Sequence, residues 1–181
     1  VHDQGKTKAL IQRDLDGIYS FLDKKKVLPH FEDFEPKLIL KPHLPEKTNK
    51  KIILGVVATR ETKMWPMEFY NNLAQLLAKE YSDLEILVPL SKSAFDQSLK
   101  KYFTAPVRFL ETSLDQLPHH LSGAMLYIGN DTGLKHLCVS LNIPTYTLFG
   151  PEPPLEWHPY ALLKHRYYFK EPLACRTEKF H

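Results

Sequence analysis

The stretch Ile52-Ile53-Leu54-Gly55-Val56-Val57-Ala58 decides the fold. An unbroken apolar run, without the alternation of a half-exposed strand, is typical of a parallel strand that is buried on both faces. Pro66 then opens a segment whose apolar residues recur at helical spacing, namely Phe69, Leu73, Leu76, Leu77 and Tyr81. The stretch is therefore predicted to be the first strand of an α/β domain.

The same alternation continues along the chain. Further strands are predicted over 84–88, 107–110, 125–129 and 144–149, and helices over 92–103, over a short segment after a Ser113–Gln116 capping box, and over 132–141. Prolines at 151, 153 and 154 then predict an irregular loop. Because a helix separates the strands, the fold class is α/β, with a doubly wound, Rossmann-like parallel sheet.

The segment before this domain has a different character. Residues 7–26 carry an apolar stripe at helical spacing and are predicted to form an amphipathic helix. Residues 27–50 are charged and rich in proline, as in a linker. The chain begins at Val1 without a methionine and ends in a charged run, so we expect a fragment of a longer protein.

Composition narrows the class of protein. The 181 residues are 43% hydrophobic and 25% charged, which is typical of a globular domain. A net charge of +3 is too small to predict nucleic-acid binding, but it suits an anionic ligand or an anionic membrane surface. No run is long enough for a transmembrane helix. Cys138 falls on an apolar helical stripe and Cys175 fits no metal spacing, which favours a reducing compartment.

Polar residues follow the predicted strands. Ligands of parallel sheets bind beyond the carboxyl ends of the strands. The segments at those ends, 59–65, 91–93, 111–113, 129–133 and 150–152, collect hydroxyls, small residues and cations. Lys63 lies in the first of them, where its ammonium would neutralise a leaving diphosphate. The alternative is that Arg60 and Lys63 are ordinary surface cations.

The fourth of these segments is the sharpest signal. Asp131 is predicted to cap the helix that follows, with Thr132 and Gly133 in its first turn. Amides of a first turn lack an intrahelical acceptor and lie at the positive end of the helix dipole, so they form a phosphate site. Gly133, without a Cβ, would let a phosphate approach the backbone closely.

Helical spacing places the other side chains of this segment. Thr132, Lys135 and His136 share one face, away from the apolar stripe formed by Leu134, Leu137, Cys138 and Leu141. A hydroxyl, an ammonium and an imidazole are thus predicted around the helix N-terminus. The alternative is an ordinary capped helix whose Lys135 and His136 are solvated.

Two of these segments resemble signatures of a known family. Residues 58–66, Ala-Thr-Arg-Glu-Thr-Lys-Met-Trp-Pro, are similar to the first signature of glycosyltransferase family 9, the ADP-heptose:lipopolysaccharide heptosyltransferases. Residues 128–137, Ile-Gly-Asn-Asp-Thr-Gly-Leu-Lys-His-Leu, followed by Leu148-Phe149-Gly150-Pro151, are similar to the second. The resemblance covers about residues 50–160.

The resemblance implies a GT-B architecture of two Rossmann-like domains, of which this chain would be the C-terminal one. Residues 1–50 would then be a connecting helix and linker from a missing N-terminal domain, and 51–181 the nucleotide-sugar (donor) binding domain. It implies an inverting glycosyltransferase that moves heptose from ADP-heptose to the lipopolysaccharide inner core in the bacterial cytoplasm. Peripheral contact with the inner membrane is left open.

The resemblance also assigns the donor site. Lys63 would contact the phosphates, with Thr59 as a second contact. Asp131, Thr132, Gly133 and His136 would form the phosphate and sugar side, and Lys135 would add a phosphate contact or be solvated. The family's catalytic base is a carboxylate of the N-terminal domain, so Glu61, Asp131 and Glu152 are not nominated for that role. The stretch 89–94 lacks the acidic residue that often holds the ribose, and the first acid is Asp96.

Other readings stay open. They are another GT-B transferase, a nucleotide-sugar epimerase, or a non-catalytic nucleotide-binding module. Walker A, G-x-G-x-x-G and H-E-x-x-H motifs are absent from the sequence. We expect no cofactor, no nucleic-acid partner and no metal site. Asp14 and Asp16 form a D-x-D pattern, but helical residues two apart point about 200° apart and would not converge on one ion.

Overall fold

The computed structural model describes residues 8–20, 22, 30, 36–40 and 50–171. Their helices and strands are, in chain order, α1 Leu10–Tyr19, β1 Lys50–Gly55, the 3-10 turn η2 Glu61–Lys63, α2 Met67–Glu80, β2 Leu84–Pro89, α3 Ala94–Ser98, η3 Leu99–Tyr102, β3 Arg108–Leu110, α4 Leu117–Leu121, β4 Leu126–Asn130, α5 Gly133–Ser140, β5 Thr145–Leu148, α6 Pro154–Trp157 and β6 His165–Tyr168.

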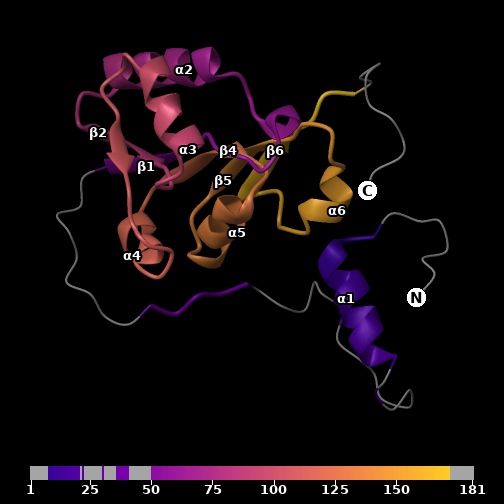
Figure 1. The fold of residues 1–181 in the computed structure, drawn as a ribbon. Helices are drawn as coiled ribbons and strands as arrows, with labels where there is room; N and C mark the ends of the chain where they lie inside the picture. Colours follow the sequence, from indigo (N-terminus) through magenta and orange to yellow (C-terminus); the bar gives the residue numbers. More distant parts are fainter. Residues whose placement is uncertain (1–7, 21, 23–29, 31–35, 41–49, 172–181) are drawn as a thin grey trace.

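A parallel sheet forms the centre of the domain, in the order β3-β2-β1-β4-β5-β6. The chain first winds from β1 toward β3, then returns to the other side of β1 and winds outward from β4 to β6. β1 and β4 are therefore neighbours at the point where the winding reverses (Figure 1). The predicted fold class, a doubly wound Rossmann-like sheet, is confirmed.

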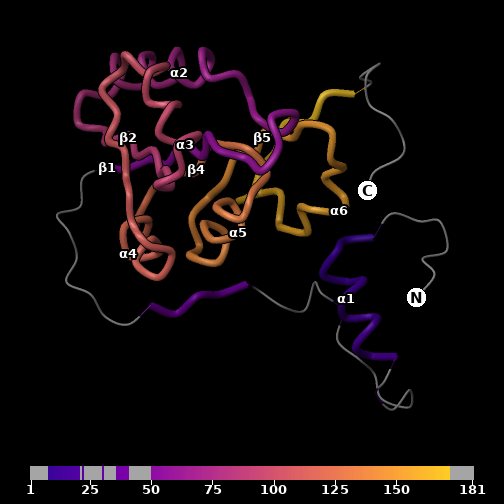
Figure 2. The backbone as a smooth tube through the Cα atoms, in the orientation of Figure 1, coloured from indigo at the N-terminus to yellow at the C-terminus, as the bar shows by residue number. Residues whose placement is uncertain are grey.

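Helices cover both faces of the sheet, as the ribbon and the backbone tube show (Figures 1 and 2). Along β1, successive side chains alternate between the faces: Ile52 and Leu54 pack in the α2 core, and Ile53 packs in the α4–α5 core. Cys138 of α5 is fully buried in the second core, as predicted, with the leucines of its stripe beside it.

The predicted apolar face of α2 is wrong in part. Phe69, Leu76 and Tyr81 are 45–62% exposed, whereas Tyr70 and Ala74 are fully buried. The helix is thus rotated relative to the predicted stripe, because Tyr70 turns its hydroxyl toward the end of β1 and donates to the Gly55 carbonyl.

The strand ends agree with the prediction to within three residues, and the remaining differences are local. Residues 92–103 divide into α3 and η3. The predicted capping box is wrong: the N-cap of α4 is Gln116, and no side-chain cap hydrogen bond forms. The predicted irregular loop contains α6, and an additional strand, β6, pairs with β5.

α1 is shorter than the predicted helix, whose residues 7, 21 and 23–26 lie outside the described residues. Ile11 and Ile18 of its predicted stripe are exposed, because the described part of the chain packs little against that face. An ion pair between Arg13 and Glu156 links α1 to α6. Asp16 accepts a hydrogen bond from Gln12 and pairs with Lys8. Most of the predicted linker, and Cys175, also lie outside the described residues.

Candidate functional site

The end of β4 holds the first predicted segment in place. Asn130 is fully buried. Its Oδ1 accepts hydrogen bonds from the Trp65 amide at 2.9 Å and the Tyr70 hydroxyl at 3.0 Å, and its Nδ2 donates to the Val56 carbonyl at 2.8 Å. One amide side chain therefore fixes the path of residues 56–65 relative to β4. Neither Asn130 nor Tyr70 was predicted as a site residue.

Two opposed glycines let β1 and β4 meet closely beneath this site. Gly55 pairs with Gly129. A Cβ built on Gly129 would lie 2.5 Å from the Gly55 carbonyl oxygen, and one built on Gly55 would fall on the Tyr127 ring. The two strands at the reversal point therefore carry the two predicted segments, 59–65 and 129–133, side by side.

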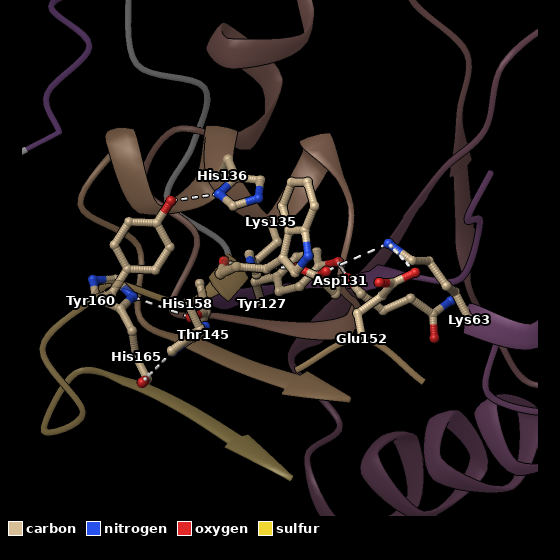
Figure 3. Close-up of polar contacts among 12 residues, drawn as sticks. Lys63, Tyr127, Asp131, Lys135, His136, Thr145, Glu152, His158, Tyr160 and His165 are labelled. Atoms are coloured by element: carbon tan, nitrogen blue, oxygen red, sulfur yellow. Dashed lines mark hydrogen bonds and ion pairs between the residues drawn. The ribbon is translucent and has the colours of Figure 1, made fainter. Parts of the chain in front are cut away.

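Four charged side chains, Arg60, Lys63, Asp131 and Glu152, gather where those segments meet. The Lys63 ammonium lies 3.7 Å from Asp131 Oδ2 and 3.7 Å from Glu152 Oε1. Glu152 and Asp131 are both buried. Arg60 pairs directly with Glu152, and the Lys63 ammonium also lies 5.6 Å from the centre of the Trp157 ring (Figure 3 shows the Lys63 part of this cluster). Lys63 is thus brought next to Asp131, as the site prediction requires, and Glu152 joins them.

Lys135 does not lie on the face predicted for it. It is fully buried, neither solvated nor on the open rim. Its ammonium contacts Asp131 Oδ1 at 2.5 Å and donates to the Trp157 carbonyl at 2.8 Å. Burial lowers the pKa of Lys135, and the Asp131 charge opposes that shift. The predicted direct phosphate contact from Lys135 is therefore wrong in this geometry, because the side chain points inward to the carboxylate one turn earlier (Figure 3).

The N-terminus of α5 is open. The N-cap is Thr132 rather than Asp131, whose carboxylate is engaged by lysines instead. The Thr132 hydroxyl is buried and lies beside the Tyr127 hydroxyl. Nothing lies within 4 Å of a Cβ built on Gly133. The amides of this first turn are thus accessible to an anion.

A pocket of about 400 Å³ extends from this helix N-terminus along the ends of β1, β2 and β3. Thr59 and Thr132 both line it, which brings the Thr59 prediction into the same site. Its wall is mostly apolar: Val57, Ala58, Leu90, Leu110, Leu114, Leu117 and Leu134. Asp96 also lines it, but its carboxylate already accepts the Ser91 amide at 2.8 Å. A flat apolar group flanked by hydroxyls fits such a pocket.

His136 faces away from the charged cluster, toward the loop before β6. Its Nδ1 lies 2.5 Å from the Tyr160 hydroxyl. Burial and then the Lys135 charge lower the pKa of His136 to about 4, so the imidazole is neutral at pH 7. Burial likewise lowers the pKa of His158 to about 4, and its Nε2 donates to the His165 carbonyl (Figure 3). The residues predicted for the site therefore lie around one helix end, with His136 on its far side.

Fold and site together define a class, a Rossmann-like domain with a candidate anion site at the reversal point of its sheet. The model of glycosyltransferase family 9 (heptosyltransferase) matches residues 6–178, and the chain belongs to that family.

Individual relatives agree. Lipopolysaccharide heptosyltransferase 1 of Escherichia coli K12 is 31% identical over 115 residues, which are 62% of this chain and 35% of the relative. The structure of E. coli heptosyltransferase WaaC with ADP-2-deoxy-2-fluoro heptose has a TM-score of 0.59 and 28% identity, and covers 69% of this chain and 38% of that one. E. coli ADP-heptose lps heptosyltransferase II has a TM-score of 0.67 at 21% identity, and covers 93% and 55%. The chain thus spans about a third to a half of the length of these relatives. Among the described residues, none of the helices is both long and apolar enough to cross a membrane.

Proposed function

We propose that this chain is the donor-binding half of an inverting glycosyltransferase that moves heptose from ADP-heptose to the lipopolysaccharide inner core. The single observation that carries the proposal is the Lys63 ammonium beside the open N-terminus of α5, at the reversal point of the sheet. Ligands of doubly wound sheets bind at that point. The similarity to a structure that contains an ADP-heptose analogue supports the choice of donor.

The residues divide by the chemistry of the donor. The Lys63 ammonium and the first-turn amides of α5, which begins at the N-cap Thr132, suit the diphosphate. The pocket that Thr59 lines suits the nucleoside. The family resemblance assigns Asp131 and His136 to the sugar, although His136 contacts Tyr160 in this structure. Residues 51–181 would form this donor domain, and 1–50 would lead from an N-terminal domain.

In the proposed reaction an acceptor hydroxyl displaces ADP from the anomeric carbon. The departing diphosphate gains negative charge, and Lys63 together with the α5 dipole would stabilise it from fixed positions. We assign no general base to this chain, and expect the base and the acceptor site on the N-terminal domain. The cytoplasmic location and the peripheral membrane contact stay predictions.

Calorimetric titration of the 181-residue chain tests the proposal. We expect ADP to bind more tightly than UDP or GDP, with the same affinity in EDTA, and no heptose transfer by the chain alone. Lys63→Ala should weaken ADP binding by about tenfold to a hundredfold, the size of one charge-assisted contact. Gly133→Val should weaken it as well without unfolding the domain, because the space at Gly133 is open.

Lys79→Ala is the matched control, since this exposed lysine lies on α2 away from the site. Unchanged ADP affinity in both Lys63→Ala and Gly133→Val would refute the site. A loss of affinity in EDTA that magnesium restores would refute the metal-free donor site.

A further inference from the structure

The ammonium of Lys135 is an unusual feature of α5. It is 0% exposed, and a buried ammonium costs several kcal/mol unless it is paired and hydrogen-bonded. Here it contacts Asp131 Oδ1 and the Trp157 carbonyl. The centres of the Phe149 and Tyr160 rings lie 5.2 and 5.6 Å from the Lys135 nitrogen. Both of its hydrogen bonds go to the protein itself, and because the side chain has no exposed surface it does not reach a ligand.

The surrounding charges divide into two close pairs and one surplus cation. Lys135 contacts Asp131 directly, and Arg60 contacts Glu152 directly. Lys63 lies 3.7 Å from one oxygen of each carboxylate, beyond hydrogen-bonding distance. Three cations and two carboxylates leave a net charge of +1, and the longer distances assign that charge to Lys63.

We propose that Lys135 is a positioning residue, which occupies one oxygen of Asp131 from inside the protein and thereby leaves the Lys63 ammonium available to a donor diphosphate. This inference rests on the proposed function of Lys63. Without Lys135, Asp131 would be a buried carboxylate with Lys63 as its nearest cation among the described residues, and Lys63 would move into contact with it. A diphosphate would then have to displace that contact.

Lys135 also holds the wall beside Lys63. Its hydrogen bond to the Trp157 carbonyl joins α5 to α6, and the Trp157 ring lies against the Lys63 ammonium. Loss of Lys135 would therefore free both neighbours of Lys63, the carboxylate on one side and the indole on the other.

The test is a cycle of Lys135→Met, Asp131→Asn and the double variant, with titration of ADP and of adenosine. ADP lacks the sugar, so a contact of Asp131 with the sugar does not enter. We expect Lys135→Met to weaken ADP binding at least about tenfold and adenosine binding hardly at all. In the double variant the capturing carboxylate is gone, while the Trp157 hydrogen bond is still missing, so ADP affinity should recover by at least about threefold relative to Lys135→Met. Lys79→Met serves as the control.

The outcomes separate the two proposals. A parent chain that does not bind ADP refutes the proposed function, and this inference with it. A parent chain that binds ADP, with Lys135→Met unchanged, overturns this inference alone. Equal losses for ADP and adenosine, or no recovery in the double variant, would show a merely structural lysine and overturn it too. If Lys135→Met does not fold, Asp131→Asn and the double variant decide, because a tenfold loss of ADP affinity in either contradicts the electrostatic role.

Discussion

Asn130→Ala is the sharpest test of the architecture beneath the site. The substitution removes three hydrogen bonds of a fully buried side chain, from the Trp65 amide, from the Tyr70 hydroxyl and to the Val56 carbonyl. The Tyr70 hydroxyl keeps a partner, the Gly55 carbonyl at 3.2 Å. The Trp65 amide and the Val56 carbonyl lose theirs, and each unsatisfied group costs about 1–3 kcal/mol.

The expected loss in the free energy of unfolding is therefore about 3–5 kcal/mol, a large share of the stability of an ordinary domain. Urea unfolding followed by circular dichroism measures it. Tyr70→Phe is the control: it removes one donor and orphans no amide, so it should cost about 1 kcal/mol. A loss below about 1 kcal/mol for Asn130→Ala, or equal losses for the two variants, would refute the reasoning.

Two further predictions concern Gly150 and the buried histidines. A Cβ on Gly150 would lie 2.7 Å from the Thr62 carbonyl oxygen and 3.2 Å from Lys63 Cα, so Gly150→Ala should shift the Lys63 backbone and weaken ADP binding, which calorimetry measures. Gly133→Ala is the control: its Cβ meets open space, so the melting temperature in thermal unfolding should stay unchanged. His136 and His158 have folded-state pKa values of about 4, against 6.5 for the free side chain. Between these two pH values the unfolded chain binds more protons than the folded chain. The free energy of unfolding should therefore fall as the pH drops from 6.5 to 4, by about 1.4 kcal/mol per pH unit for each histidine. Urea unfolding at pH 7, 5.5 and 4 measures the slope, which His158→Gln should reduce; a flat profile would contradict the two shifts.

The sheet could be predicted from the sequence because its strands are unbroken apolar runs and its helices separate them. β6 was missed for the opposite reason. Its sequence, His-Arg-Tyr-Tyr over 165–168, has no apolar run, since it pairs at the edge of the sheet and leaves Tyr168 exposed. The buried face of α2 was misassigned because helical spacing alone does not show which of two adjacent aromatic residues is buried. Tyr70 is buried, and Phe69 beside it is exposed.

The site was predicted where backbone position alone decides it. Lys63 and Asp131 follow strands that any doubly wound sheet brings together, so their approach follows from topology. The burial of Lys135 depends instead on a partner: Asp131 precedes it by four residues, and that spacing was the available signal for an ion pair. Glu152 lies in a proline-rich loop, where no periodicity indicates that its carboxylate turns inward to Arg60 and Lys63.

Two carboxylates beside the proposed phosphate site would ordinarily repel an anionic ligand. In this chain each carboxylate has its own close cation, Lys135 for Asp131 and Arg60 for Glu152, so the charge that remains toward a ligand is the +1 at Lys63. The α5 dipole adds about half a positive charge at the same place. The carboxylates then restrain the Lys63 ammonium from two sides at 3.7 Å without the close contact that a diphosphate would have to displace, while Asn130 fixes the backbone that carries it. An ammonium restrained in this way loses little conformational entropy when an anion binds. Such a fixed cation is suited to stabilise the charge of the proposed leaving diphosphate.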